Sequence, residues 1–180
     1  MEPASQAESS PLDDTTIAGV FEVGLFCGVL RREDLIQWAD AEIEQRAEPA
    51  EWLLDLSLSG NAHILDVVGL LRRASAPANS LAICRVLFAL LPDVEGASPD
   101  KMAVLAHRIY RVTYWHLGPD WTNPLLREAD KLHEDFNLAL YALIGYSLED
   151  ACRQLRDFVR RFKDVETARR LWPVRWHSEE

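Results

Sequence analysis

The sequence has little cysteine, no long apolar run and no excess of basic residues. Its three cysteines, Cys27, Cys84 and Cys152, are odd in number and form no C-x-x-C pair. This pattern argues against a disulfide framework and predicts buried thiols. No stretch approaches the roughly 18 uninterrupted apolar residues that a membrane-spanning helix requires. The apolar segment 17–30 follows acidic rather than basic residues and itself contains Glu22, so it does not resemble an export signal. We therefore expect a cytoplasmic protein with no membrane partner.

Catalytic signatures are also missing. The chain contains no phosphate-binding loop, no G-x-G-x-x-G, no G-x-S-x-G and no H-E-x-x-H. No serine or cysteine stands next to a recognisable base. These absences favour a non-enzymatic protein that uses neither a cofactor nor a metal.

Negative charge is concentrated in the first third of the chain. Residues 1–60 contain 13 Asp or Glu against three Arg, a net charge of −10 that equals the net charge of all 180 residues. Nucleic acid is an unsuitable partner, because binding it requires clustered cations. The charge favours either a basic protein partner, attracted over long range, or an acidic surface that only keeps the protein in solution.

The hydrophobic pattern is helical, and no alternating β-branched runs are present. We expect an all-α fold: a single compact domain of about eight helices with mostly antiparallel neighbours. Residues 1–14 should form a flexible polar tail and residues 15–180 the helical domain. Ser98-Pro99 and Ser147 are typical helix starts. The expected helices cover about 16–30, 33–47, 50–56, 62–73, 80–91, 99–115, 125–144 and 148–162. Trp172 and Trp176 indicate a C-terminal tail that docks on the domain or offers a contact surface.

Two polar clusters are candidate ligand sites. Asp130, His133, Glu134 and Asn137 share one helix face, and Asp-x-x-His resembles half of a carboxylate-bridged metal site. The only partner sequence is His63-x-x-Asp66, which has the reverse order, so a solvated polar face is the alternative. The second cluster, from His107 to Trp115 with His116 beside it, either lines a pocket or packs in the core.

Basic residues lie along the last expected helix and just after it, from Arg153 to Lys163. Acidic residues spaced four positions from Arg153 and Arg161 predict a salt-bridged surface there rather than an anion site.

Part of the first 75 residues resembles a known class of proteins. The residues Trp38-Ala39-Asp40, then Pro49, then the segment 55–61 (DLSLSGN) are similar to small acidic helical proteins of bacteria. Some of these serve as immunity proteins for secreted polymorphic toxins. The resemblance implies a cytoplasmic protein that binds one toxin domain and blocks its active site, but it transfers no individual functional residue.

The sequence thus favours a non-catalytic protein-binding module, most specifically an immunity protein with a basic toxin domain as partner. The predicted contact residues are Asp40, Glu44, Glu48 and Glu51, with Trp121 as an aromatic anchor in a loop. The alternative is a small helical enzyme or ligand binder that uses the His133 face or the His107–Trp115 cluster.

Overall fold

The computed structural model of the protein describes residues 12–76, 78–141 and 145–177. Within these ranges the regular elements are nine α-helices and one 3-10 helix, with no strand, which confirms the all-α class. The elements are α1 (Asp14–Phe26), α2 (Arg32–Gln45), α3 (Glu51–Ser57), η1 (Leu58–Asn61), α4 (Ile64–Ser75), α5 (Ser80–Ala89), α6 (Pro99–Leu117), α7 (Pro124–Leu140), α8 (Leu148–Phe162) and α9 (Val165–Arg170).

Each of the eight expected helices corresponds to one of α1 to α8. The ninth, α9, lies in the stretch that the sequence assigned to the C-terminal tail. Its six residues are too few to show a helical period, but Asp164 marks its start by accepting hydrogen bonds from the backbone N–H groups of Glu166 and Thr167. Asp164 was therefore the residue from which the start of α9 could have been predicted.

Two predicted helix starts are confirmed by their capping hydrogen bonds. The Ser98 hydroxyl accepts from the backbone N–H of Lys101, and Pro99 occupies the first position of α6. The Ser147 hydroxyl accepts from the backbone N–H of Asp150 at 3.3 Å. Both bonds satisfy N–H groups that have no partner inside the helix.

The first helix ends earlier than expected, at Phe26 rather than near residue 30. Gly28 has φ +69°, a left-handed conformation that glycine adopts without a side-chain clash. The carbonyl of Gly24 accepts hydrogen bonds from the backbone N–H groups of Val29 and Leu30, at 2.9 and 3.0 Å. The apolar run therefore continues past the helix as a tight, buried turn.

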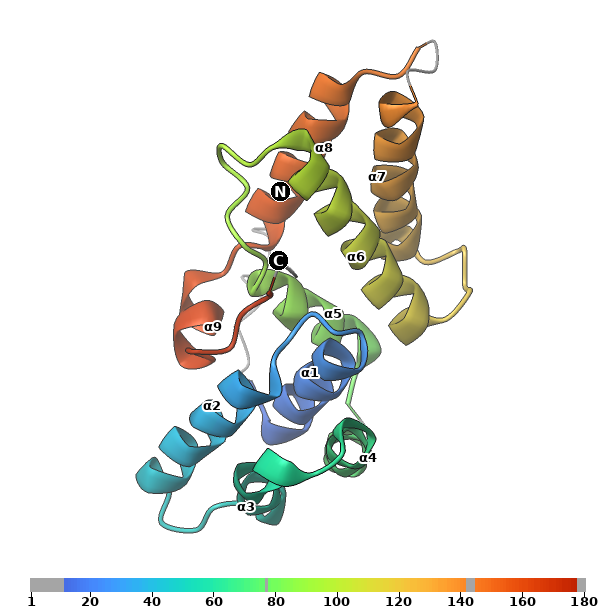
Figure 1. The fold of residues 1–180 in the computed structure, drawn as a ribbon. Coiled ribbons are helices and arrows are strands. Elements are labelled where there is room, and N and C mark those ends of the chain that lie inside the picture. The colour runs from blue at the N-terminus through green and yellow to red at the C-terminus, as the bar shows by residue number, and fades with distance from the viewer. Residues whose placement is uncertain (1–11, 77, 142–144, 178–180) are drawn as a thin grey trace, which may run out of the picture.

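Helix α1 is the centre of the core. Eight of its 13 residues are buried, and it packs against α4, α5 and α6. Figure 1 shows α1 to α4 at one end of the molecule and α6 to α8 at the other. Helix α5 lies between these groups and contacts α1, α6, α8 and α9.

The C-terminal segment returns to the middle of the fold, which confirms the docked tail for one of its two tryptophans. Trp176 is 4% exposed, and its indole Nε1 donates a hydrogen bond to the carbonyl of Leu87 at 2.8 Å. The next backbone N–H, of His177, donates to the carbonyl of Val29 at 3.0 Å. Trp172, in contrast, is 66% exposed. The tail thus joins the turn after α1 to the end of α5.

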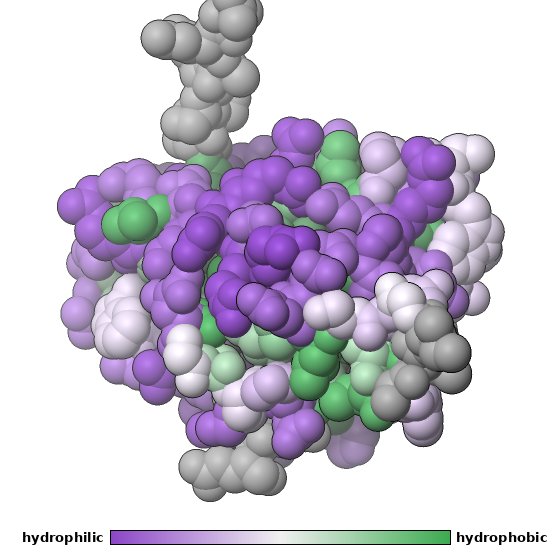
Figure 2. All heavy atoms as spheres, turned by 90° about the horizontal axis from the view of Figure 1, so that it is seen from above, coloured by the Kyte–Doolittle hydropathy of each residue, from purple (hydrophilic) through white to green (hydrophobic). Residues whose placement is uncertain are grey.

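Figure 2 views the molecule from the end where α6, α7 and α8 lie. Hydrophilic side chains cover most of this face, and hydrophobic side chains show toward its lower edge. Among the helices in the described ranges, none combines the length and the apolarity needed to cross a membrane.

Candidate functional site

The four predicted carboxylates belong to one helical hairpin, formed by α2 and α3. Asp40 and Glu44 are one turn apart on α2, Glu48 lies in the connection, and Glu51 begins α3. All four side chains are exposed. The hydroxyl of Ser57 donates to the carboxylate of Asp40, which ties the end of α3 to the middle of α2. The structure therefore places these residues on one supersecondary unit.

Acidic side chains elsewhere in the first third are largely paired inside the fold. Arg46 binds Asp14 at 2.7 Å and Glu42 at 2.6 Å, and Arg72 binds Glu22 at 2.8 Å. In contrast, the ion pairs formed between described residues include none of the four predicted carboxylates. These four charges are therefore left without an ion pair among the described residues, whereas Glu42 on the same hairpin is paired with Arg46.

The outer face of α3 adds three residues that the sequence analysis missed. Leu54, Asp55 and Leu58 follow Glu51 at i+3, i+4 and i+7, so all four share one side of the helical segment. Leu54 is 43% exposed and Leu58 is 84% exposed. The sequence could have identified these residues, because their positions on the helix are offset from those of the buried Leu53 and Leu56 and so face away from the core. We call the surface formed by Asp40, Glu44, Glu48, Glu51, Leu54, Asp55 and Leu58 the acidic hairpin face.

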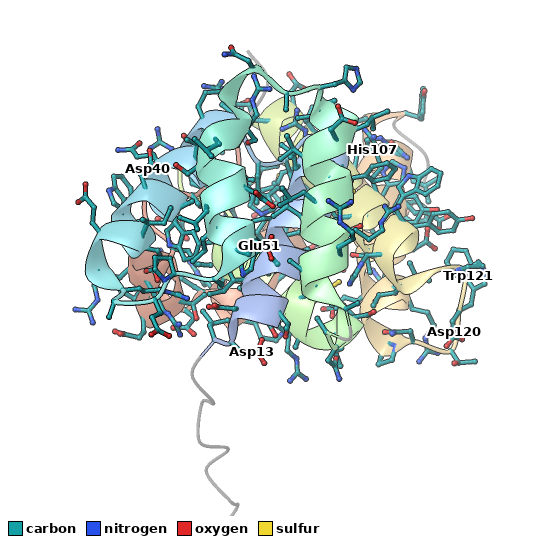
Figure 3. All side chains as sticks on the ribbon, turned by 90° about the horizontal axis from the view of Figure 1, so that it is seen from below. Asp13, Asp40, Glu51, His107, Asp120 and Trp121 are labelled. Carbon is teal, nitrogen blue, oxygen red and sulfur yellow. The ribbon has the colours of Figure 1, made fainter. Side chains whose placement is uncertain are left out.

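Trp121 lies elsewhere. Figure 3 shows it in the α6–α7 connection, at the opposite side of the molecule from Asp40. There it belongs to a chain of aromatic rings that are exposed except for the half-buried Tyr114. The ring centroids of Tyr114 and Trp121 are 6.4 Å apart, those of Tyr114 and Trp115 6.2 Å, and those of Phe26 and Trp115 6.4 Å. The structure therefore does not bring Trp121 into one surface with the four carboxylates.

The two polar clusters that the sequence presented as separate alternatives meet in part, where His107 and Tyr110 of one contact His133 of the other. The rings of His107 and His133 lie 4.7 Å apart, and Tyr110 stacks on His133 at 5.2 Å. Nε2 of His133 lies 3.1 Å from the amide nitrogen of Asn137. These histidines line a hollow of about 400 Å³ beside Cys27. The pKa of His107 is lowered, first by desolvation of its ring and then by the neighbouring His133, which favours the neutral imidazole.

The metal hypothesis gains no ligand set. Among the residues that the structure describes, no three or more His, Cys, Asp or Glu side chains gather closely enough to hold an ion. His63, in the only possible matching sequence, caps α4, since its Nδ1 accepts from the backbone N–H of Leu65 at 3.3 Å. Within the described part of the chain, the polar face around Asp130 and Glu134 is therefore not faced by a second set of metal-ligating side chains.

The prediction of buried thiols is confirmed for two of the three cysteines. Cys84 and Cys152 are buried, and Cys27 is half-buried. Burial raises the pKa of Cys27 to about 11 and that of Cys84 to about 12. Since the thiolate is the nucleophile, Cys27 is a weak one at neutral pH although it lines the histidine hollow.

Comparisons of the chain with protein-family models, curated proteins and solved structures find no match.

Proposed function

We propose that this chain is a non-catalytic protein-binding module whose acidic hairpin face binds a basic surface of a partner protein. In its most specific form, it is a bacterial immunity protein that acts in the cytoplasm, with a toxin domain as the partner. The observation that carries the proposal is the row of exposed carboxylates on α2 and α3 that have no ion-pair partner within the described fold.

The carboxylates and the leucines of this face would contribute to binding in different ways. Exposed carboxylates steer a basic partner and raise the association rate, and each contributes little to the final affinity. Leu54 and Leu58 supply apolar area that loses water in the complex. A standard interface covers about 800 Å² on each partner, so the contact would extend over both α2 and α3.

This arrangement suggests how the partner would be inhibited. Toxins that cleave nucleic acid or use nucleotides need cationic side chains to hold phosphate groups. A carboxylate-rich face binds the same cations and excludes the substrate. The inhibitor then needs no catalytic group of its own.

The test begins with a pull-down from the native host at low and at high salt, with mass spectrometry of the captured proteins. We expect one stoichiometric basic partner whose recovery falls with salt, because exposed charges are screened. The triple variant Glu44→Gln, Glu51→Gln, Asp55→Asn should lower its association rate by about tenfold or more at low salt.

The matched control removes three charges from other faces by Asp66→Asn, Asp100→Asn and Glu134→Gln. These carboxylates are also exposed and without an ion pair among the described residues, so the change in net charge is identical. The proposal requires the control to bind like the wild-type protein. No stoichiometric partner, or equal loss in the two triple variants, refutes a specific role for the hairpin.

A second candidate function is supported by the juxtaposition of His107 and His133. Two imidazole rings beside a hollow of about 400 Å³ form a small ligand site. Metal and metabolite analysis of protein purified from the native host tests this alternative. A stoichiometric small molecule that is lost in His133→Ala would favour it over the binding module.

A further inference from the structure

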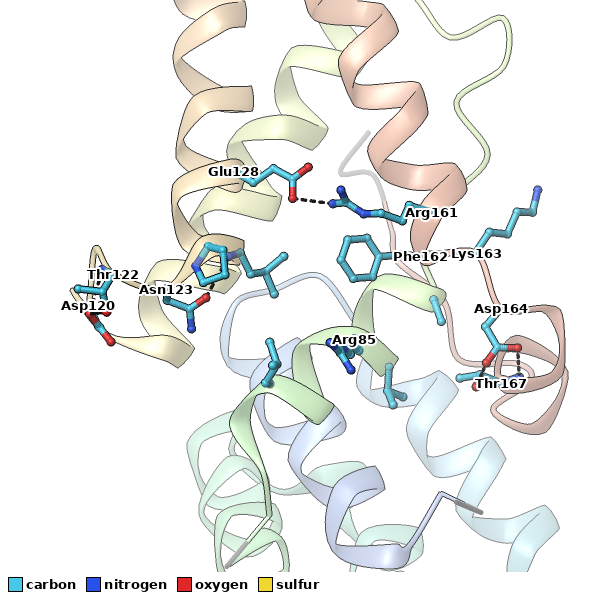
Figure 4. Close-up of a pocket in the computed structure, with 15 residues that line it drawn as sticks. Arg85, Asp120, Thr122, Asn123, Glu128, Arg161, Phe162, Lys163, Asp164 and Thr167 are labelled. Atoms are coloured by element: carbon cyan, nitrogen blue, oxygen red, sulfur yellow. Dashed lines mark hydrogen bonds and ion pairs between the residues drawn. The ribbon is translucent and has the colours of Figure 1, made fainter. Parts of the chain in front are cut away.

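A groove of the described surface lies apart from the acidic hairpin face. It has a volume of about 760 Å³ and lies between α5, the start of α7 and the segment from the end of α8 into α9 (Figure 4). Its volume falls within the 300 to 1,000 Å³ range typical of small-molecule sites. Its apolar lining comes from Leu81, Val86, Ala89, Pro124, Leu125 and Phe162.

The charged walls of the groove are held by bonds within the protein. Arg161 binds Glu128 at 2.6 Å, which connects α8 to α7. The same guanidinium lies over the ring of Phe162 at 4.9 Å. On the α9 side, the Asp164 carboxylate accepts a hydrogen bond from the hydroxyl of Thr167 at 2.7 Å. The sequence predicted salt bridges for these basic residues with partners four positions away on α8, whereas the structure gives Arg161 a partner on α7.

Arg85 differs from the other cations of the groove. Lys163 reaches Asp93 at 3.4 Å and Arg161 reaches Glu128, but no hydrogen bond or ion pair joins Arg85 to another residue of the described chain. Figure 4 shows Arg85 in the middle of the groove, with Phe162 above it and Asp164 to one side. An exposed cation with no partner among the described residues therefore lies beside the apolar side chains of the groove.

We propose that this groove binds a small organic monocarboxylate with an apolar body. The carboxylate would accept two parallel hydrogen bonds from the guanidinium of Arg85, a geometry that arginine favours. The body of the ligand would lie along Phe162 and the apolar side chains of α5 and α7. This site is separate from the acidic hairpin face, so it stands or falls independently of the proposed function.

The charges of the lining disfavour a multiply charged anion. Three basic and three acidic side chains line the groove, and two of the basic ones are already paired. A phosphate dianion would meet Asp120, Glu128 and Asp164 with only one free guanidinium to offset its charge. A cationic ligand would face Arg85 directly.

The test is a titration of ¹⁵N-labelled full-length protein with sodium 4-phenylbutyrate, followed by two-dimensional NMR. We expect saturable shifts confined to residues 81–89, 122–128 and 161–167, with a Kd of the order of 1 mM for so small a probe. The neutral amide 4-phenylbutanamide and the dianion phenyl phosphate should each bind at least about tenfold more weakly.

Two arginine variants identify the residue responsible. Arg85→Gln should weaken 4-phenylbutyrate binding by about tenfold or more, since a charge-assisted bidentate pair is lost. Arg73→Gln removes an exposed arginine of α4 that has no ion pair among the described residues, and it should bind like the wild-type protein. Shifts outside the groove, equal binding of the amide, or unchanged binding in Arg85→Gln each overturn the proposal.

Discussion

Truncation of Trp176 tests whether the C-terminal tail is part of the folded core. The side chain is 4% exposed, its ring lies 6.3 Å from that of Phe88, and its indole nitrogen donates to the carbonyl of Leu87. Trp176→Ala should lower the free energy of unfolding by about 3 to 5 kcal/mol, because a large buried ring leaves a cavity. For a domain of this size that loss corresponds to a fall in Tm of roughly 6 to 20 °C.

The hydrogen bond of the indole contributes a smaller part of this loss. Trp176→Phe keeps most of the buried ring but removes the donor, so we expect a cost of about 1 to 2 kcal/mol. The carbonyl of Leu87 is not left without a partner, since it also accepts from the backbone N–H of Leu90 at 3.2 Å.

Trp172 provides the matched control, since it is the same residue type four positions away and is 66% exposed. Trp172→Ala should change the free energy of unfolding by less than about 0.5 kcal/mol. Urea denaturation followed by circular dichroism at 222 nm measures all three variants. A loss below about 1 kcal/mol for Trp176→Ala, or equal losses at the two positions, would refute the assignment of the tail to the core.

Four further predictions concern titration, thiol reactivity, packing and helix propensity. Burial lowers the pKa of His116, so the unfolded chain binds the proton more readily than the folded protein does. The stability that comes from keeping this histidine neutral is fully present above about pH 6.5 and is lost as the pH falls through the lower pKa of the folded state. Thermal melts between pH 7.5 and 5 should therefore show a decline in Tm that His116→Gln reduces. Cys27, with a pKa of about 11, should react with iodoacetamide at pH 8 about a hundredfold more slowly than free cysteine, as measured by mass spectrometry. Gly24→Ala should cost about 1 to 3 kcal/mol, because the added Cβ would lie 2.3 Å from a methyl group of Leu30. Gly69→Ala should stabilise α4 by up to about 1 kcal/mol in the same urea assay, since its nearest atom is 3.9 Å away.

The fold class followed from local features of the sequence. Ser98-Pro99 and Ser147 were recognisable because a helix cap needs only a side-chain oxygen and the backbone a few residues ahead. The end of α1 was missed because the apolar run continues beyond it, and hydrophobicity reports burial rather than backbone conformation. Only the left-handed conformation of Gly28 marks the change.

The candidate sites were less accessible to sequence reasoning because they depend on how elements pack. Asp40 and Glu51 belong to consecutive helices joined by a short connection, so their place on one hairpin was within reach of local reasoning. His107 and His133 meet only because α6 packs against α7. Arg85 and Arg161 share a groove through contacts between α5 and α8. The hydrophobic periodicity of a helix predicts which of its faces is buried, but it does not predict which other helix packs against that face.

The charge pattern of the acidic hairpin face has an energetic consequence that distinguishes binding from folding. Asp40 with Glu44, and Glu51 with Asp55, are like-charged pairs at i, i+4, each of which destabilises its helix by about 0.2 to 0.5 kcal/mol. Removing these charges should therefore leave the fold as stable as before or slightly more stable. A basic partner would relieve the same repulsion on binding. The electrostatic repulsion that destabilises the free protein would therefore add to the favourable free energy of binding. Weaker binding together with unchanged or higher stability then identifies the hairpin as a contact surface, because a variant that merely damaged the fold would lose both.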